Sequence, residues 1–104
     1  MKQFLKNLLG SGPKVDYNEL LKQGAVIVDV RTKSEYKSGH IKSSVNIPLD
    51  NLRNNLSKLK NDKCIICCCA SGMRSTSAKS ILKSNGFKEV YNGGGWLSLQ
   101  NKIG

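Results

Sequence analysis

The chain lacks any apolar run that approaches the length needed to span a bilayer, about 20 residues, so no integral membrane segment is expected. It contains a single histidine, His40, and its four cysteines crowd into one short stretch. A structural zinc site usually draws its ligands from separated pairs, so no metal site is predicted. Internal repeats and low-complexity tracts are also absent, and the 104 residues fit one ordinary domain.

Acidic residues are scarce as well: 7 Asp and Glu oppose 17 Lys and Arg, which gives a formal net charge of +10. A basic surface attracts anions in general, and nucleic acid is the first partner to consider. The basic residues are mostly scattered lysines, and the aromatics, 6% of the chain, are not interleaved with them as a base-stacking surface requires. We therefore expect a solvated surface that attracts small anions, and no nucleic-acid partner.

The four cysteines are Cys64, Cys67, Cys68 and Cys69. Neighbouring side chains of an extended strand point to opposite faces, so adjacent cysteines are poorly placed to form disulfides. We interpret the first three as small strand side chains, mostly buried. Free thiols are typical of a reducing compartment, and the sequence therefore predicts a cytoplasmic protein.

Short apolar runs alternate with helix-like segments along the chain. The predicted strands are residues 14–15, 25–30, 45–47, 64–68 and 87–91. The predicted helices include one that Asp16 and Glu19 start as a capping-box-like pair, one amphipathic helix over 49–59 and one over 77–85. The three glycines at 93–95 predict a flexible turn before a short helix that begins near Trp96.

This alternation is typical of an α/β fold with a parallel sheet and helices on both faces. Right-handed crossovers bring the carboxyl ends of all parallel strands to one edge of the sheet. Asp29 and Cys69 both stand near such strand ends. We therefore expect the functional site at this edge, where open α/β sheets bind their ligands.

Residues 69–75, Cys-Ala-Ser-Gly-Met-Arg-Ser, connect the fourth predicted strand to the helix at 77–85. Consecutive backbone N–H groups in such a loop converge on one point, and a helix N-terminus adds partial positive charge there. Both effects favour a thiolate over a thiol. The pKa of Cys69 should therefore be lowered, and Cys69 is the predicted nucleophile.

Three segments together resemble a rhodanese domain. The first runs from Asp29 to Ile41 and is followed by Asn46-Ile47-Pro48, and the second is the loop 69–75. The third combines Gly86-Phe87, Val90-Tyr91 and Gly94-Gly95-Trp96. The resemblance covers residues 14–104. Residues 1–13 are predicted to be a basic N-terminal extension, and Phe4, Leu5, Leu8 and Leu9 would fall on one face if this segment forms a short helix.

The resemblance implies a three-layer domain with a central five-stranded parallel sheet, and it implies sulfurtransferase activity without a metal or other cofactor. Cys69 would take the outer sulfur of a small anionic donor, thiosulfate or a persulfide, and would hold it as a cysteine persulfide. It would then pass the sulfur to a thiol, a protein acceptor or cyanide. Backbone N–H groups of the loop would surround the terminal sulfur. The predicted substrate-binding residues are Ala70, Ser71, Gly72, Met73, Arg74 and Ser75.

Asp29 and Arg31 are the predicted supporting residues. Asp29 either accepts hydrogen bonds from Arg31 or from the loop, or caps the next turn. Arg74 either binds an incoming oxyanion or braces the loop, and it is the only basic side chain there. The sequence therefore does not distinguish thiosulfate from a persulfide as the sulfur donor. We interpret His40 as a structural residue rather than a general base.

Spacing distinguishes this loop from that of rhodanese-fold phosphatases. Four residues separate Cys69 from Arg74, and the resemblance implies that phosphatases have one residue more, which makes room for phosphate. The shorter loop favours a single sulfur atom. The alternative is a non-catalytic rhodanese-fold module for protein binding or sulfur relay. The cysteine speaks against an inactive module, and no particular oligomeric state is predicted.

Overall fold

The computed structural model describes residues 14–104, so the extension predicted at residues 1–13 lies outside the described part. Four strands form one parallel sheet in the order β2-β1-β3-β4. They are β1 (Val26–Asp29), β2 (Val45–Asn46), β3 (Ile65–Cys69) and β4 (Val90–Gly95). The predicted α/β class with a parallel sheet is confirmed.

The predicted number of five strands is wrong, because residues 14–15 do not join the sheet in the described part of the chain. Asp16 follows them directly and starts helix α2 (Tyr17–Lys22). The Asp16 carboxylate accepts the backbone N–H of Glu19 at 3.0 Å, which fixes the chain in the first helical turn. Lys14 and Val15 therefore lead into this helix and pair with no strand of the described sheet.

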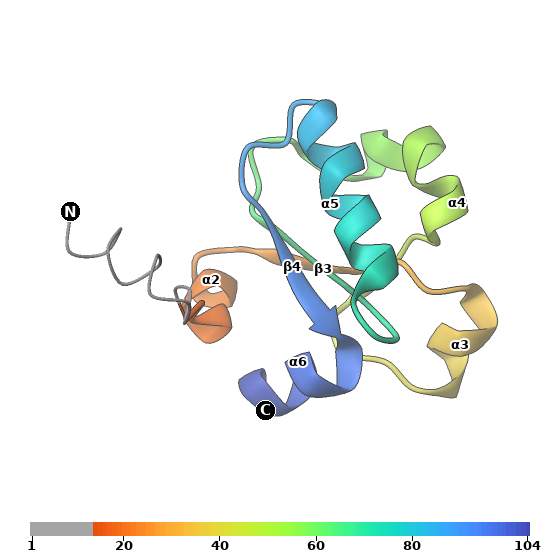
Figure 1. The fold of residues 1–104 in the computed structure, drawn as a ribbon. Helices are drawn as coiled ribbons and strands as arrows, with labels where there is room; N and C mark the ends of the chain where they lie inside the picture. The colour runs from red at the N-terminus through yellow and green to blue at the C-terminus, as the bar shows by residue number, and fades with distance from the viewer. Residues whose placement is uncertain (1–13) are drawn as a thin grey trace.

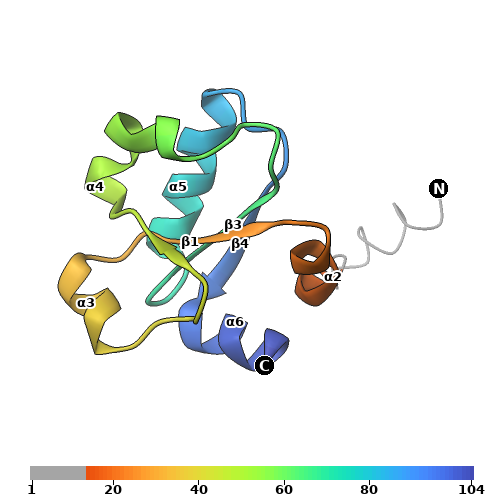
Figure 2. The same cartoon turned by 180° about the vertical axis from the view of Figure 1, so that it is seen from behind.

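Helices cover both faces of the sheet, as predicted (Figures 1 and 2). On one face, α2 and α6 (Trp96–Ile103) pack around Ile27, Ile66 and Leu99. The other face carries α4 (Leu49–Leu52), the 3-10 segment η2 (Arg53–Lys58) and α5 (Met73–Ser84). The sheet is thus the middle layer of three.

Strand β3 divides its side chains between these two layers. Ile65, Cys67 and Cys69 contribute to the core under α4 and α5, whereas Ile66 and Cys68 contribute to the core under α2 and α6. All five side chains are buried because both faces of a central parallel strand are covered. The cysteine-rich run is therefore core-forming, and only its last member stands at the carboxyl edge.

The single helix predicted over residues 49–59 is wrong. The structure has α4 followed by η2, and the backbone of Asn55 departs from helical geometry at φ −125°. The Asn55 side chain donates a hydrogen bond to the carbonyl of Asn51 at 2.7 Å. Asn side chains compete with the helical backbone for such carbonyls. The apolar spacing still points one face of the segment to the core, where Leu52 is fully buried.

The flexible turn predicted at residues 93–95 is also wrong, because β4 continues through these glycines. A Cβ atom at Gly93 would lie 2.9 Å from Leu99 Cδ2 and 3.0 Å from the carbonyl oxygen of Cys67. Glycine at this position therefore lets β4 pass closely between β3 and α6. Helix α6 begins at Trp96, as the sequence predicted. None of the helices within residues 14–104 combines the length and the hydropathy that a membrane crossing requires.

Candidate active site

The candidate site is built where β3 ends and α5 begins. Helix α5 starts at Met73, four residues before the predicted start at Ser77, so the last three residues of the predicted loop, 73–75, belong to the first helical turn. Gly72 precedes the helix with φ +105°, a backbone conformation that favours glycine. The early start leaves the backbone N–H of Ser75 without a helical partner and free to serve the site.

Two backbone N–H groups point at the Cys69 sulfur. The N–H of Gly72 donates to Sγ at 3.0 Å, and the N–H of Ser75 donates to the same atom at 3.3 Å. Cys69 is only 1% exposed, so a reactant must bring a small and unhindered atom to the sulfur. Two backbone N–H groups that converge on one atom form an anion-binding nest at this sulfur.

These donors govern the ionisation of Cys69. Burial alone raises the pKa of the Cys69 thiol, but hydrogen bonds from the Ser75 hydroxyl and from the backbone N–H groups of Ser75 and Gly72 outweigh it. The net result is a lowered pKa. The thiolate is therefore favoured without any cation in direct contact with the sulfur.

The other three cysteines behave in the opposite way. Burial raises the pKa of Cys67 and of Cys68 to about 12, and it also raises the pKa of Cys64. No N–H donor to these sulfur atoms is found in the described structure. Cys69 is thus distinguished from its neighbours by its position at the strand end and by the nest.

Asn92 of β4 is a site residue that the sequence analysis missed. Its Oδ1 atom accepts the backbone N–H of Gly94 at 2.9 Å and the Ser75 hydroxyl at 2.6 Å. Its Nδ2 atom donates to Thr76 Oγ1 at 2.7 Å and lies 3.4 Å from the carbonyl oxygen of Gly72. Asn92 therefore ties the loop and the first turn of α5 to the sheet. The only signal in the sequence is a polar residue at the end of an apolar strand.

The single proton of the Ser75 hydroxyl has competing acceptors. Asn92 Oδ1 lies at 2.6 Å, the carbonyl of Gly72 at 3.0 Å and Cys69 Sγ at 3.5 Å. The shortest contact holds the proton on the Asn92 side, and a neutral Cys69 then donates its S–H to Ser75 Oγ. On ionisation of the thiol, the hydroxyl must rotate to donate to the sulfur. The backbone N–H groups donate in either state, so they are the constant part of the stabilisation.

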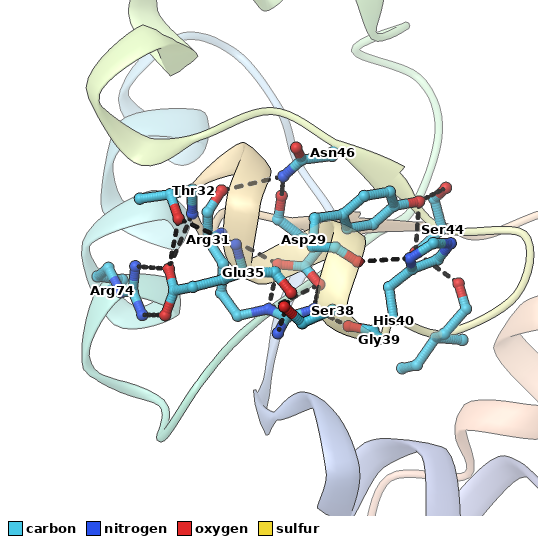
Figure 3. Close-up of polar contacts among 12 residues, drawn as sticks. Asp29, Arg31, Thr32, Glu35, Ser38, Gly39, His40, Ser44, Asn46 and Arg74 are labelled. Carbon is cyan, nitrogen blue, oxygen red and sulfur yellow. Dashed lines mark hydrogen bonds and ion pairs between the residues drawn. The ribbon is translucent and has the colours of Figure 1, made fainter.

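Arg74 pairs with Glu35 of α3 (Lys33–Ser38), as Figure 3 shows. Its two terminal nitrogens contact the two carboxylate oxygens at 2.8 and 2.9 Å. The hydrogen bonds from Arg74, and next those from the backbone of Thr32, lower the pKa of Glu35 to about 2. The same pair raises the pKa of Arg74. Of the two predicted roles for Arg74, the structure contains the contacts of the brace.

The predicted supporting residues, Asp29 and Arg31, contact each other (Figure 3). Arg31 Nη2 donates to Asp29 Oδ2 at 2.7 Å and to the carbonyl of Gly39 at 2.7 Å. The Arg31 guanidinium also lies 4.6 Å from the centre of the Trp96 ring. Hydrogen bonds to Asp29 raise the pKa of Arg31 despite its burial. The pair fixes α3 and α6 to the end of β1, and neither residue hydrogen-bonds to the loop in the described structure.

His40 is held by Tyr36 of the same helix–loop segment. Its Nδ1 atom lies 2.7 Å from the Tyr36 carbonyl oxygen, and the two rings stack with centroids 3.7 Å apart. These contacts agree with the structural interpretation of this residue. Within residues 14–104, no group of three or more His, Cys, Asp or Glu side chains is arranged to hold a metal ion.

Fold and loop together define a class: a parallel α/β domain that presents a nested cysteine at the carboxyl edge of its sheet. The chain belongs to the rhodanese-like domain family, which matches residues 14–102. Among curated relatives, thiosulfate sulfurtransferase GlpE of Pseudomonas savastanoi pv. phaseolicola is 34% identical over 87 residues, which cover 84% of this chain and 82% of that protein. The uncharacterized protein YqhL of Bacillus subtilis is 36% identical over 80 residues, or 76% of this chain.

The tRNA uridine(34) hydroxylase of Buchnera aphidicola is 36% identical over 83 residues, or 73% of this chain. The chain spans 64% of the length of YqhL and 27% of the length of this hydroxylase. Among solved structures, the human single-domain sulfurtransferase TSTD1 is similar with a TM-score of 0.73 at 25% identity, and the match covers 88% of this chain and 98% of that one. Sulfurtransferase-like chemistry is thus supported at the level of the family.

Proposed function

We propose that the protein is a sulfurtransferase in which Cys69 carries a sulfane sulfur as a persulfide between a donor and an acceptor. The observation that carries this proposal is the pair of backbone N–H groups on Cys69 Sγ, at 3.0 and 3.3 Å, together with the lowered pKa of that thiol alone among the four. The relatives with sulfurtransferase names add support at the level of the family.

In the first step, the Cys69 thiolate attacks the outer sulfur of the donor. A bond forms between Sγ and that sulfur, and the sulfur–sulfur bond inside the donor breaks. The electron pair of the broken bond leaves on sulfite when the donor is thiosulfate, or on a thiolate when it is a persulfide. Because Cys69 is almost fully buried, a terminal sulfur suits the site better than a hindered atom.

In the second step, an acceptor thiolate or cyanide attacks the terminal sulfur of the Cys69 persulfide. The new bond forms to the acceptor while the bond to Sγ breaks, and its electron pair returns to Cys69 as the thiolate. The N–H groups of Gly72 and Ser75 stabilise the negative charge that the leaving sulfur recovers. The donor and the acceptor react in turn, so ping-pong kinetics are expected.

Intact mass spectrometry tests the proposal. The reduced protein, incubated with thiosulfate or with cysteine persulfide, should gain one sulfur atom and should lose it on addition of cyanide. Cys69→Ser should gain none, and Cys64→Ser should behave as wild type because Cys64 lies outside the nest. A wild-type protein that gains no sulfur from either donor would contradict the proposal.

We also propose residues 14–104 as the sulfur-transfer domain and the cytoplasm as its compartment. The match of the family over residues 14–102 supports the first assignment. Four cysteines present as free thiols support the second.

A further inference from the structure

The only cation of the loop is already paired. Arg74 Nη1 contacts Glu35 Oε1 at 2.8 Å and Nη2 contacts Oε2 at 2.9 Å, so the planar fork faces one carboxylate in the bidentate arrangement. The side chains are 35% and 37% exposed, which places the pair at the surface of the site. An incoming anion at Arg74 therefore meets a neutral pair, with a carboxylate next to the guanidinium.

Glu35 is held in place from its other side. The backbone N–H of Thr32 donates to Oε1 at 2.9 Å, and the Thr32 hydroxyl accepts the backbone N–H of Glu35, which completes a capping box on α3. The carboxylate is thus preorganised by α3 before Arg74 reaches it. Displacing it would cost the helix one of its caps.

The remaining loop side chains supply no replacement for this charge. Ala70 and Met73 are apolar, and Met73 is 80% exposed on the surface of the loop. The backbone N–H groups of Gly72 and Ser75 are occupied by the Cys69 sulfur itself. A doubly charged donor therefore approaches an anionic thiolate with no free cation in the loop to compensate for the repulsion.

We propose that Glu35 is a specificity-determining residue, which neutralises Arg74 and thereby favours persulfide donors over thiosulfate at Cys69. The inference rests on the proposed sulfurtransferase function and names its donor class. In the step it favours, Cys69–S⁻ attacks the outer sulfur of a hydropersulfide R–S–SH. The Sγ–S bond forms, the R–S–SH sulfur–sulfur bond breaks, and R–S⁻ leaves with the electron pair while the proton stays on the transferred sulfur.

The test is Glu35→Gln, because the amide oxygen of glutamine can keep the capping-box hydrogen bond while the substitution removes the charge and one of the two acceptors that Arg74 contacts. We measure kcat/KM with thiosulfate and with cysteine persulfide at low salt. Wild type should prefer cysteine persulfide, and the variant should shift the ratio toward thiosulfate by roughly tenfold, chiefly through KM. The shift should shrink as salt is raised, because the pair is exposed.

Glu19→Gln is the matched control. Glu19 occupies the same first-turn position of α2, and its substitution changes the net charge by the same amount. In Glu19→Gln, the ratio of kcat/KM values for the two donors should stay within twofold of wild type. A second variant, Met73→Lys, adds a cation at an exposed loop position and should shift the ratio in the same direction without touching Glu35.

The outcomes separate the two proposals. Equal use of both donors by wild type, or a preference for thiosulfate, overturns the role of Glu35 and leaves the sulfurtransferase function intact. If the ratio of kcat/KM values for the two donors is unchanged in both Glu35→Gln and Met73→Lys, the role of Glu35 is likewise overturned. If neither donor transfers sulfur to wild-type Cys69, the sulfurtransferase function and the donor preference fall together.

Discussion

Replacing Asn92 by aspartate should raise the pKa of Cys69. Asn92 Oδ1 lies 2.6 Å from Ser75 Oγ, and Ser75 Oγ lies 3.5 Å from Cys69 Sγ. The carboxylate of an aspartate at position 92 would therefore lie within about 6 Å of the sulfur. At an effective dielectric constant of about 20 to 40, two unit charges at that distance repel by about 1.4 to 2.8 kcal/mol. This repulsion corresponds to a rise of about one to two pKa units.

Loss of the Asn92 side-chain amide should also raise the pKa of Cys69. Asn92 Nδ2 donates to Thr76 Oγ1 at 2.7 Å, and an ionised aspartate has no proton to donate there. The loop that carries the N–H groups of Gly72 and Ser75 is then held less firmly. At a pH well below both pKa values, each unit of rise lowers the thiolate fraction, and with it the reaction rate, about tenfold.

The assay is the rate of alkylation of Cys69 by iodoacetamide between pH 5 and pH 10, in a background where Cys64 is serine. The midpoint of the rate profile reports the pKa. Asn54→Asp, an exposed substitution in η2 with the same change of charge, should leave the midpoint within about 0.3 units of wild type. A folded Asn92→Asp protein with a wild-type midpoint would refute the electrostatic link between Asn92 and the sulfur.

Three further predictions concern packing and the Arg74 pair. Gly95→Ala should destabilise the fold by about 1–3 kcal/mol in urea unfolding, because its Cβ would lie 2.8 Å from the carbonyl oxygen of Ala70. Leu99→Ala, at a fully buried position, should cost about 2–5 kcal/mol, whereas Leu97→Ala, 59% exposed, should stay within about 0.5 kcal/mol of wild type. The pKa of Glu35 is lowered from an ordinary value of 4.5 to about 2 in the folded state. Its pair should therefore stabilise the protein fully above about pH 5 and be lost as the pH falls towards 2, so the stability difference between wild type and Glu35→Gln should shrink over that range.

Much of the fold followed from local patterns in the sequence. The continuous apolar runs of β1 and β3 predicted these two buried strands, and the predicted cap at Asp16 starts α2. The predicted fifth strand failed because two residues offer no pattern that distinguishes a strand from the lead-in to a cap. The predicted helix over 49–59 failed because an Asn side chain competes with the backbone at a single position, which apolar periodicity does not report.

The candidate site was predictable where it depends on chain neighbours and not where it depends on tertiary contacts. The Gly72 and Ser75 N–H groups lie within six residues of Cys69, so a loop argument anticipated them. Asn92 and Glu35 come from segments 17 and 39 residues away from their partners Ser75 and Arg74. Nothing along the chain indicates that α3 brings the Glu35 carboxylate to the loop, so the sequence does not predict this contact.

Two sources of positive potential act on an anion in this protein: the net charge of the chain and the N–H dipoles at the sulfur. The formal charge of +10 attracts anions from a distance, an effect that salt screens. At the sulfur, charge is stabilised by neutral N–H dipoles, since Arg74 is engaged by Glu35. Dipoles that already point at the sulfur need no reorganisation during the reaction. In the proposed reaction, the surface therefore increases the encounter rate with anions in general, whereas the nest and the Glu35–Arg74 pair decide which donor reacts.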